Sequence, residues 1–235
     1  RDRLLLGAVY GNGTDIDDDI SAFISNPMEH AEASKIALFS IADYAWNMDA
    51  YKSDASWRRA VRYLMPGHAA ALQVFASHNS DLGGNEHDFR REESEQIRPA
   101  LERLLDAYCR EGKREVAAAS AVTEECERMI ASADLLLASD ENPALIKEIS
   151  PWLIQFKLLG EYGREVLCML AAQCDGKKTE LEKAASHAKA LQVLMKKIDA
   201  TYNQNGFQPG VKTGSCHLKP AFDRLYQEVV QRTGK

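Results

Sequence analysis

The sequence predicts an all-α protein, a multi-helix bundle preceded by a short segment that contains β-structure. Three observations lead to this class. Apolar residues recur at spacings of three and four over most of the chain after residue 27. Before residue 27, the apolar runs are short and are broken by glycines and acidic residues, which is typical of strands and turns. The length of 235 residues allows a sizeable core in one large domain or two small ones.

Composition excludes several classes of protein. The chain carries 29 basic and 35 acidic residues, a net charge of −6, and no basic cluster of the kind that binds nucleic acid. No apolar run approaches the ~18 residues of a membrane span. The first residue is Arg1 and no leader follows it, so we interpret the sequence as a piece of a longer protein. The five cysteines form no metal-binding spacing and are expected to be buried apolar residues: Cys109, Cys126, Cys168, Cys174 and Cys216.

The N-terminal part predicts a strand that leads into a central helix. Short strands are expected at 3–7 and 21–25. Asn26 is a good N-cap, Pro27 suits the first helical position, and Glu29 completes a capping-box pattern. From Ile36 to Trp46 the helix that follows is apolar nearly all round, so we expect it to be buried on most sides.

The remaining elements are helices joined by two long polar loops. The loops are expected at 77–91 and 203–217. Apolar stripes predict helices at about 54–65, 68–76, 97–112, 122–142, 151–176, 181–202 and 218–231.

Two groups of residues could in principle hold a metal ion. Asp15, Asp17 and Asp19 alternate as in a calcium loop, but Ile20 stands where the turn needs glycine and Asn26 where it needs the bidentate glutamate. The first polar loop holds a second group: His78, Asp81, Glu86, His87 and Asp88. No spacing in it specifies a metal, so a hydrogen-bonded or solvated loop is favoured. We predict no metal and no cofactor.

Other candidate residues have a structural explanation that is favoured over a functional one. The tryptophans at 46, 57 and 152 could stack on sugars, but each lies in an apolar helical stripe, which favours core packing. His30 and His187 are expected to be packing or surface residues of helices. Phe207 and Lys212, in the second loop, are candidates for contact with a partner or a substrate.

The sequence also resembles a known family. The motifs that carry the resemblance run through the whole chain: SNPMEHAEASK at 25–35, ADYAWN at 42–47, HNSDLG at 78–83, RREES at 90–94, PW at 151–152, QFKL at 155–158, NQN at 203–205 and QPGVKT at 208–213. They resemble the segment that follows the catalytic barrel in family 84 glycoside hydrolases. These are bacterial O-GlcNAcase-like β-N-acetylglucosaminidases, often described as hyaluronidases.

The resemblance implies a domain division and one substrate-binding residue. Residues 1–26 would be the end of a (β/α)8 barrel, and residues 27–235 a helical bundle domain. In the family, the Asn of the Asn-Pro pair hydrogen-bonds sugar hydroxyls at the carboxyl end of the last barrel strand, the face where barrels bind ligands. Considered by itself, Asn26 is better explained as a helix cap. With the resemblance, we expect a sugar-binding role in the intact enzyme and a capping role in an isolated fragment.

The resemblance places the chemistry outside this sequence. The family uses two neighbouring aspartates of the barrel in a substrate-assisted, retaining mechanism, and no residues here match that pair. Asp17 to Asp19 cannot be that pair, because in the family the catalytic aspartates lie much earlier in the barrel than this segment. We therefore expect the fragment alone to be inactive, with no catalytic residue of its own.

The resemblance also suggests binding partners, and an alternative function remains open. The partner through the parent enzyme would be a glycan or glycoprotein bearing N-acetylglucosamine. Self-association as a homodimer, and a secreted or periplasmic location, are suggested by the family alone. The alternative is a stand-alone helical module for protein interaction, without a glycosidase parent.

Overall fold

The computed structural model describes residues 2–16, 18, 20–80 and 91–233. Within these ranges the chain is all-α, as predicted, and its helices are α1 (Ala31–Trp46), α2 (Ser53–Leu64), α3 (Ala69–Ser77), α4 (Arg98–Glu111), α5 (Val116–Leu137), α6 (Pro143–Cys174), α7 (Lys178–Thr201) and α8 (Leu218–Thr233). None of these helices is both long enough and apolar enough to cross a membrane.

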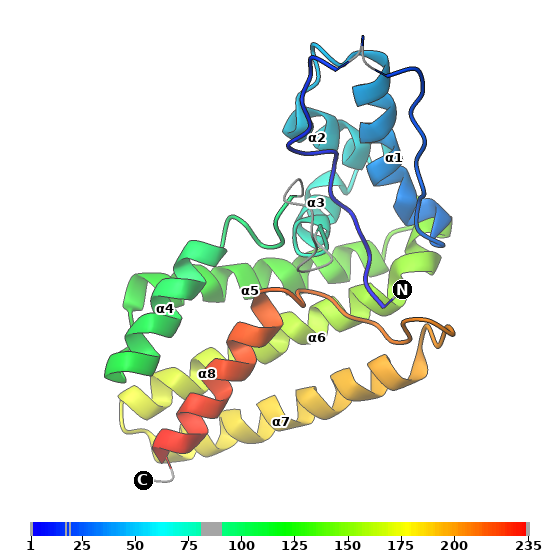
Figure 1. Ribbon diagram of the computed structural model, residues 1–235. Coiled ribbons are helices and arrows are strands. Elements are labelled where there is room, and N and C mark those ends of the chain that lie inside the picture. The colour runs from blue at the N-terminus through cyan, green and yellow to red at the C-terminus, as the bar shows by residue number, and fades with distance from the viewer. Residues whose placement is uncertain (1, 17, 19, 81–90, 234–235) are drawn as a thin grey trace.

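The long helix α6 is the centre of the bundle. It packs against α5, α7 and α8, and its N-terminal part also contacts α1 (Figure 1). Helices α1, α2 and α3 form the upper part of the molecule in this view, and α4 to α8 form the lower part. Glycines of α6 allow its neighbours to approach closely, since a Cβ on Gly163 would lie 2.5 Å from the Phe222 ring of α8 and 2.8 Å from Cys126 Sγ of α5. One large buried cluster therefore joins the two parts of the molecule.

The short strands expected at 3–7 and 21–25 are not present in the described part of the chain. Residues 3–9 run in extended form, with Leu4 and Leu6 buried. The backbone of Leu6 is nevertheless fully bonded, because its N–H donates to the Asn79 carbonyl (2.8 Å) and its carbonyl accepts from Trp57 Nε1 (2.7 Å). The residue two positions after α3 and a tryptophan of α2 thus supply the bonds that a neighbouring strand would give.

Helix α1 differs from its prediction in two ways. It begins at Ala31, with His30 at the N-cap position, so the capping box built on Asn26 and Pro27 is wrong. It is also buried on one side only, with Trp46 90% exposed, so the expectation of a core position fails for this tryptophan. It holds for Trp57 and Trp152, which are each 2% exposed. Among the cysteines only Cys126 is fully buried, and Cys168 and Cys174 are exposed, contrary to expectation.

Helix α6 begins at Pro143, eight residues before its predicted start at Pro151. Pro151 lies inside the helix and does not begin it. Asn142 caps the helix by accepting from the Leu145 N–H (3.2 Å), and Pro143 occupies the first turn. A proline in a helix removes the bond to the carbonyl four residues earlier. Here that carbonyl belongs to Lys147, and it accepts from the Ser150 hydroxyl instead (3.2 Å). Helix α5 is also displaced from its prediction, since it runs from Val116 to Leu137 and not from about 122 to about 142. Helix α4 ends as predicted at Gly112, which has a φ of 67°.

Candidate functional site

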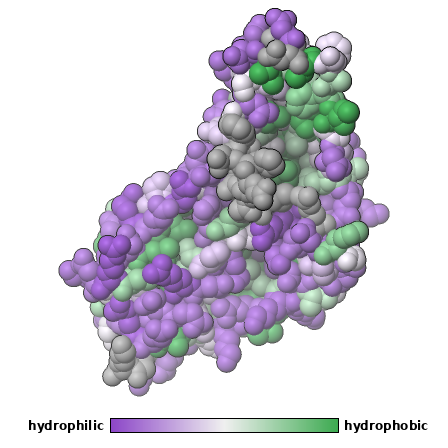
Figure 2. Space-filling view, in the orientation of Figure 1, coloured by the Kyte–Doolittle hydropathy of each residue, from purple (hydrophilic) through white to green (hydrophobic). Residues whose placement is uncertain are grey.

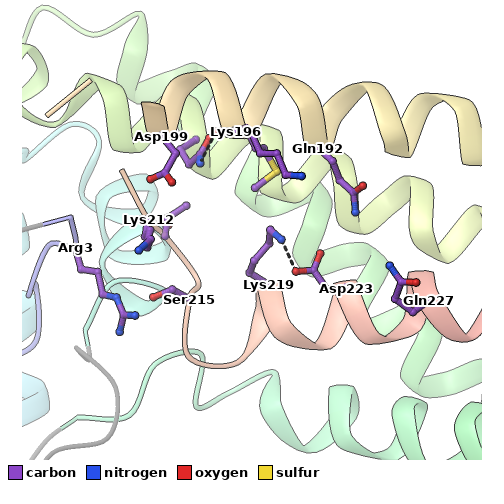
Figure 3. A pocket seen from close by; sticks show the side chains of 12 residues that line it. Arg3, Gln192, Lys196, Asp199, Lys212, Ser215, Lys219, Asp223 and Gln227 are labelled. Atoms are coloured by element: carbon purple, nitrogen blue, oxygen red, sulfur yellow. Dashed lines mark hydrogen bonds and ion pairs between the residues drawn. The ribbon is translucent and has the colours of Figure 1, made fainter. Parts of the chain in front are cut away.

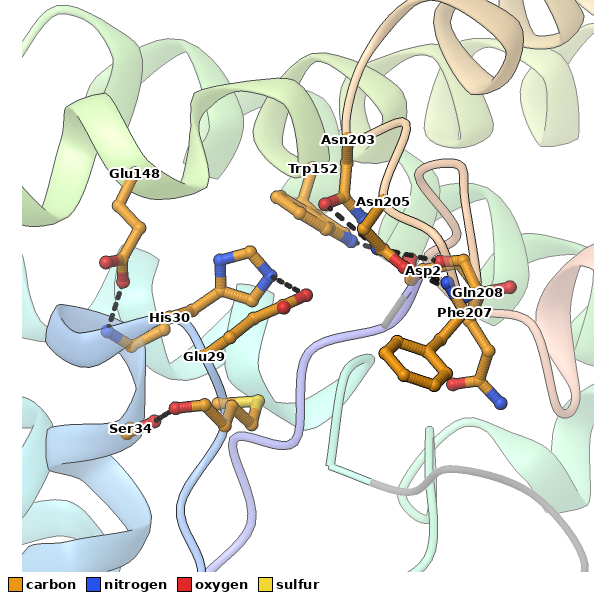
Figure 4. Close-up of polar contacts among 12 residues, drawn as sticks. Asp2, Glu29, His30, Ser34, Glu148, Trp152, Asn203, Asn205, Phe207 and Gln208 are labelled. Carbon is orange, nitrogen blue, oxygen red and sulfur yellow. Dashed lines mark hydrogen bonds and ion pairs between the residues drawn. The ribbon is translucent and has the colours of Figure 1, made fainter.

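A groove of about 880 Å³ runs beside the segment that leads into α1. One wall is this segment, including Asn26, and one face of α1 with Leu38 and Ile41. The other wall is the second polar loop, at Asn205, Phe207 and Gln208. Figure 4 shows these loop residues on the side of the groove opposite Glu29 and His30. We call it the Asn26–Phe207 groove; these two residues are 181 positions apart in the sequence.

The Asn26 side chain is exposed in this groove and does not cap α1. Within the described part of the chain, its amide has no hydrogen-bond partner. The helix start is served by another residue, since Glu148 Oε1 of α6 accepts from the Ala33 N–H (2.8 Å) (Figure 4). A carboxylate at this position also suits the positive end of the helix dipole. The cap and the sugar-binding role therefore do not compete for the Asn26 amide.

Asn205 makes three of the hydrogen bonds that hold the loop wall in shape. Asn205 Oδ1 accepts from the N–H groups of Phe207 (3.0 Å) and Gln208 (2.9 Å), and its Nδ2 donates to the Gln208 carbonyl (3.0 Å). Asparagine commonly stabilises a tight turn in this way. The turn holds Phe207 outward with 97% of its surface exposed. An exposed ring opposite an unbonded amide is a combination that can bind a sugar, through the apolar face of the ring and through the sugar hydroxyls.

The base of the site links the N-terminal segment to α6. The His30 ring packs edge-on against Trp152, with centroids 4.8 Å apart. Trp152 Nε1 donates to the Asp2 carbonyl (2.9 Å), and the Asp2 carboxylate pairs with Lys212 Nζ (2.6 Å). Lys212, a candidate for partner contact, is thus held by Asp2 and does not line the groove. His30 is a packing residue as expected, whereas His187 is a surface residue.

The histidine of the first polar loop belongs to a buried hydrogen-bonded network. His78 is 1% exposed; its Nδ1 lies 2.7 Å from Ser94 Oγ and its Nε2 2.7 Å from Glu125 Oε1. Burial lowers the pKa of His78 to about 4, so the neutral ring accepts from Ser94 and donates to Glu125. The hydrogen-bonded interpretation of His78 is confirmed.

Most residues of the two candidate metal-binding groups lie outside the part of the chain that the structure describes. Asp81, Glu86, His87 and Asp88 lie outside the described residues, as do Asp17 and Asp19. Among the residues that are described, no group of three histidines, cysteines or carboxylates could hold a metal ion.

Two parts of the chain match known protein families. Residues 93–226, more than half of the chain, match the family described as bacterial GH84, post-catalytic domain. The chain belongs to this family. Residues 1–77 match a second family, described as beta-N-acetylglucosaminidase. The resemblance read from the sequence motifs is therefore confirmed.

Solved GH84 structures share the fold. CpGH84D is 26% identical with a TM-score of 0.83, and the match covers 98% of this chain and 38% of that one. CpGH84B is 23% identical with a TM-score of 0.82, covering 95% and 37%. An O-GlcNAc hydrolase mutant of Thermobaculum terrenum is 19% identical with a TM-score of 0.72, covering 100% and 48%. The GH84 chain described here therefore spans less than half the length of each of these relatives.

The two family matches meet at the groove of the GH84 chain. Asn26 lies in the part that matches the β-N-acetylglucosaminidase family, and Phe207 lies in the part that matches the post-catalytic domain. No local pattern in the sequence indicates that these residues share a groove. Asn205 and Gln208 were not singled out from the sequence either, although the position of Asn205 before a glycine is a recognisable turn signal.

Proposed function

We propose that this chain is the C-terminal part of a β-N-acetylglucosaminidase that removes terminal β-linked N-acetylglucosamine from glycoconjugates or glycosylated proteins. Residues 1–26 complete the catalytic barrel of that enzyme, and residues 27–235 form the helical domain that supports it. The proposal is carried by the match of residues 1–77 to the β-N-acetylglucosaminidase family, followed in the same chain by the match of residues 93–226 to the post-catalytic domain.

In this enzyme Asn26 binds the sugar. Its amide is exposed, is not used in capping, and offers both a donor and an acceptor to neighbouring hydroxyls. In the sequence it directly follows residues 21–25, the segment expected to be the last barrel strand, and a barrel presents its ligand-binding side chains from the ends of such strands.

The exposed apolar surface of the N-terminal part supports the same proposal. Tyr10, Ile20, Phe23, Ile24 and Trp46 are all exposed, Ile24 to 92% and Trp46 to 90%. Figure 2 shows green, hydrophobic side chains gathered on the upper part of the molecule, over α1 and its surroundings. Contiguous apolar surface of this kind marks a place where another structure packs. The rest of the barrel is the structure that we propose to cover it.

The catalytic aspartate pair belongs, in this proposal, to the barrel that this chain completes. The mechanism is substrate-assisted and retaining: the N-acetyl oxygen of the substrate attacks the anomeric carbon, one aspartate orients that group, and the other acts as general acid and then as general base. Asn26 contributes only binding. The helical domain positions the segment that carries Asn26, through the Glu148 bond to α1 and the Trp152 bond to Asp2.

The test compares nitrophenol release from an aryl β-N-acetylglucosaminide by the 235-residue chain and by its longest natural parent, with and without Asn26→Ala. We expect activity only in the parent. The variant should lose about ten- to a hundredfold in kcat/KM, the value of one or two hydrogen bonds to the sugar. Asn47→Ala, an exposed asparagine after α1, serves as the control and should keep normal activity.

Two results would reject parts of the proposal. A parent with Asn26→Ala and unchanged kinetics would remove Asn26 from the sugar site. Absence of hydrolysis in both proteins would favour the alternative, a helical interaction module whose exposed apolar surface binds another protein.

A further inference from the structure

A second cavity lies between α7, α8 and the segment that precedes α8. Its volume is about 580 Å³, which is in the range of small-molecule sites. Figure 3 shows Lys196 and Asp199 reaching it from α7, and Lys219 and Asp223 from α8, with Lys212 on the preceding segment. We call it the α7–α8 cleft. The Asn26–Phe207 groove shares none of its lining residues.

Two buried side chains that line this cleft each have a polar oxygen without a hydrogen-bond partner in the part of the chain that the structure describes. Gln155 is 6% exposed and its Nε2 donates to the carbonyls of Met195 (3.2 Å) and Val211 (3.1 Å), which fixes the orientation of the amide. Its Oε1 is left without a hydrogen bond among the described residues. Thr213 is 4% exposed, and its hydroxyl also has no hydrogen-bond partner among the described residues. Such groups cost free energy unless a ligand or water satisfies them.

The charge around the cleft is of the opposite sign to that of the protein. The chain has a net charge of −6, yet the charged lining is four cations and two carboxylates: Arg3, Lys196, Lys212, Lys219, Asp199 and Asp223. Both carboxylates already have donors. Asp199 accepts from the Val211 N–H (2.8 Å), and Asp223 accepts from the Tyr162 hydroxyl (3.0 Å) and pairs with Lys219. Lys196 has no acidic partner within the described part of the chain.

We propose that the α7–α8 cleft binds a sugar acid, that is, a small polyhydroxylated carboxylate. Its hydroxyl groups donate to Gln155 Oε1 and bond with the Thr213 hydroxyl, and its carboxylate pairs with Lys196. This matches each unsatisfied group of the cleft with a complementary one. The site does not depend on the proposed glycosidase activity, because none of its lining residues lines the Asn26–Phe207 groove.

Three probes of related chemistry separate the parts of the proposal in isothermal titration at constant ionic strength. Gluconate carries hydroxyls and a carboxylate, sorbitol carries the same carbon chain without the charge, and acetate carries the charge alone. We expect measurable binding for gluconate and at least about fivefold weaker binding for each of the other two, the value of about one hydrogen bond or ion pair.

Two variants assign the binding to this cleft. Lys196→Met removes the unpaired cation, and Thr213→Val removes the buried hydroxyl with little change of shape. Each substitution should weaken the binding of gluconate about fivefold or more. Lys189→Met, on an exposed position of α7 outside the cleft, is the matched control and should bind as the unmodified protein does. Thermal unfolding of each variant without ligand checks that it is folded.

The proposal is overturned if gluconate binds no more tightly than acetate, because the site is then a simple anion site. It is also overturned if sorbitol equals gluconate, or if neither folded cleft variant changes the affinity.

Discussion

His78 Nε2 lies 2.7 Å from Glu125 Oε1, and both side chains are buried between the end of α3 and the middle of α5. The same Glu125 carboxylate pairs with Arg128, and the other nitrogen of His78 bonds Ser94, which has a φ of 60°. Next to Ser94, Glu93 accepts from the N–H groups of Cys216 (3.1 Å) and His217 (3.0 Å) just before α8. The network thus joins the ends of the first polar loop to α5 and α8.

Acidification should weaken the fold through His78. Its pKa is lowered in the native state from 6.5 to about 4, first by burial and also by Arg128, with Glu93 opposing. Because the unfolded chain takes up the proton first, the stabilisation is complete above pH 6.5 and is lost as the pH falls toward 4. The slope is at most about 1.4 kcal/mol of unfolding free energy per pH unit.

Urea unfolding at several pH values checks this, with His78→Gln compared against His187→Gln, which changes a half-exposed histidine. The slope should be reduced only in the first variant. If that variant does not fold, NMR titration of the unmodified protein decides the question, and a His78 ring that titrates near 6.5 contradicts the prediction.

Glu125→Leu should destabilise the chain by about 1–3 kcal/mol, since it leaves the buried His78 N–H without an acceptor. Glu125→Gln keeps an acceptor at the same position and should cost clearly less. Denaturant unfolding measures both changes. Glu124→Leu, at the neighbouring exposed position, controls for helix propensity. Equal losses for the Leu and Gln variants of Glu125 would show that charge, and not the hydrogen bond, is what the network requires.

Gly163→Ala should destabilise the bundle by about 1–3 kcal/mol through overpacking. A Cβ there would meet the Phe222 ring at 2.5 Å and Cys126 Sγ at 2.8 Å, so α5 and α8 would both have to move. Gly206→Ala is the matched control, because a Cβ there has no heavy atom within 4 Å. The midpoint of thermal unfolding should fall in the first variant and change little in the second. A stable Gly163→Ala protein would mean that the three helices pack less tightly than described.

Phe207→Ala should leave stability unchanged, since 97% of the side chain is exposed, but should weaken hydrolysis in the parent enzyme. We expect a loss of about five- to tenfold in kcat/KM for a glycopeptide substrate, the value of about one aromatic contact. Val193→Ala, on an exposed position of α7, is the control. Unaltered kinetics in Phe207→Ala would exclude the loop wall of the groove from substrate binding.

The helical class and most helix ends could be predicted because they depend on local signals. The stripe of α4 ends at Gly112, a residue that adopts the left-handed conformation, and the stripe of α8 begins at Leu218 as expected. Predictions failed where another side chain, distant or neighbouring, took the role that the local pattern assigned. Asparagine is a common helix cap, but at the start of α1 it is Glu148 of α6, and not Asn26, that accepts a hydrogen bond from the helix. Pro151 looks like a helix start, but the Ser150 hydroxyl bonds the carbonyl that it leaves free.

The sequence by itself determined the family, the helical fold class and the candidacy of Asn26, because motifs and apolar periodicity are properties of neighbouring residues. Only the tertiary structure decided that Asn26 and Phe207 line one groove, that His78 is neutral between Ser94 and Glu125, and that Gln155 and Thr213 line one cleft. Each of these depends on segments far apart in the chain, and their distances are set by how α6 packs against the helices around it. Periodicity indicates which face of a helix is buried, but it does not specify the partner that buries it.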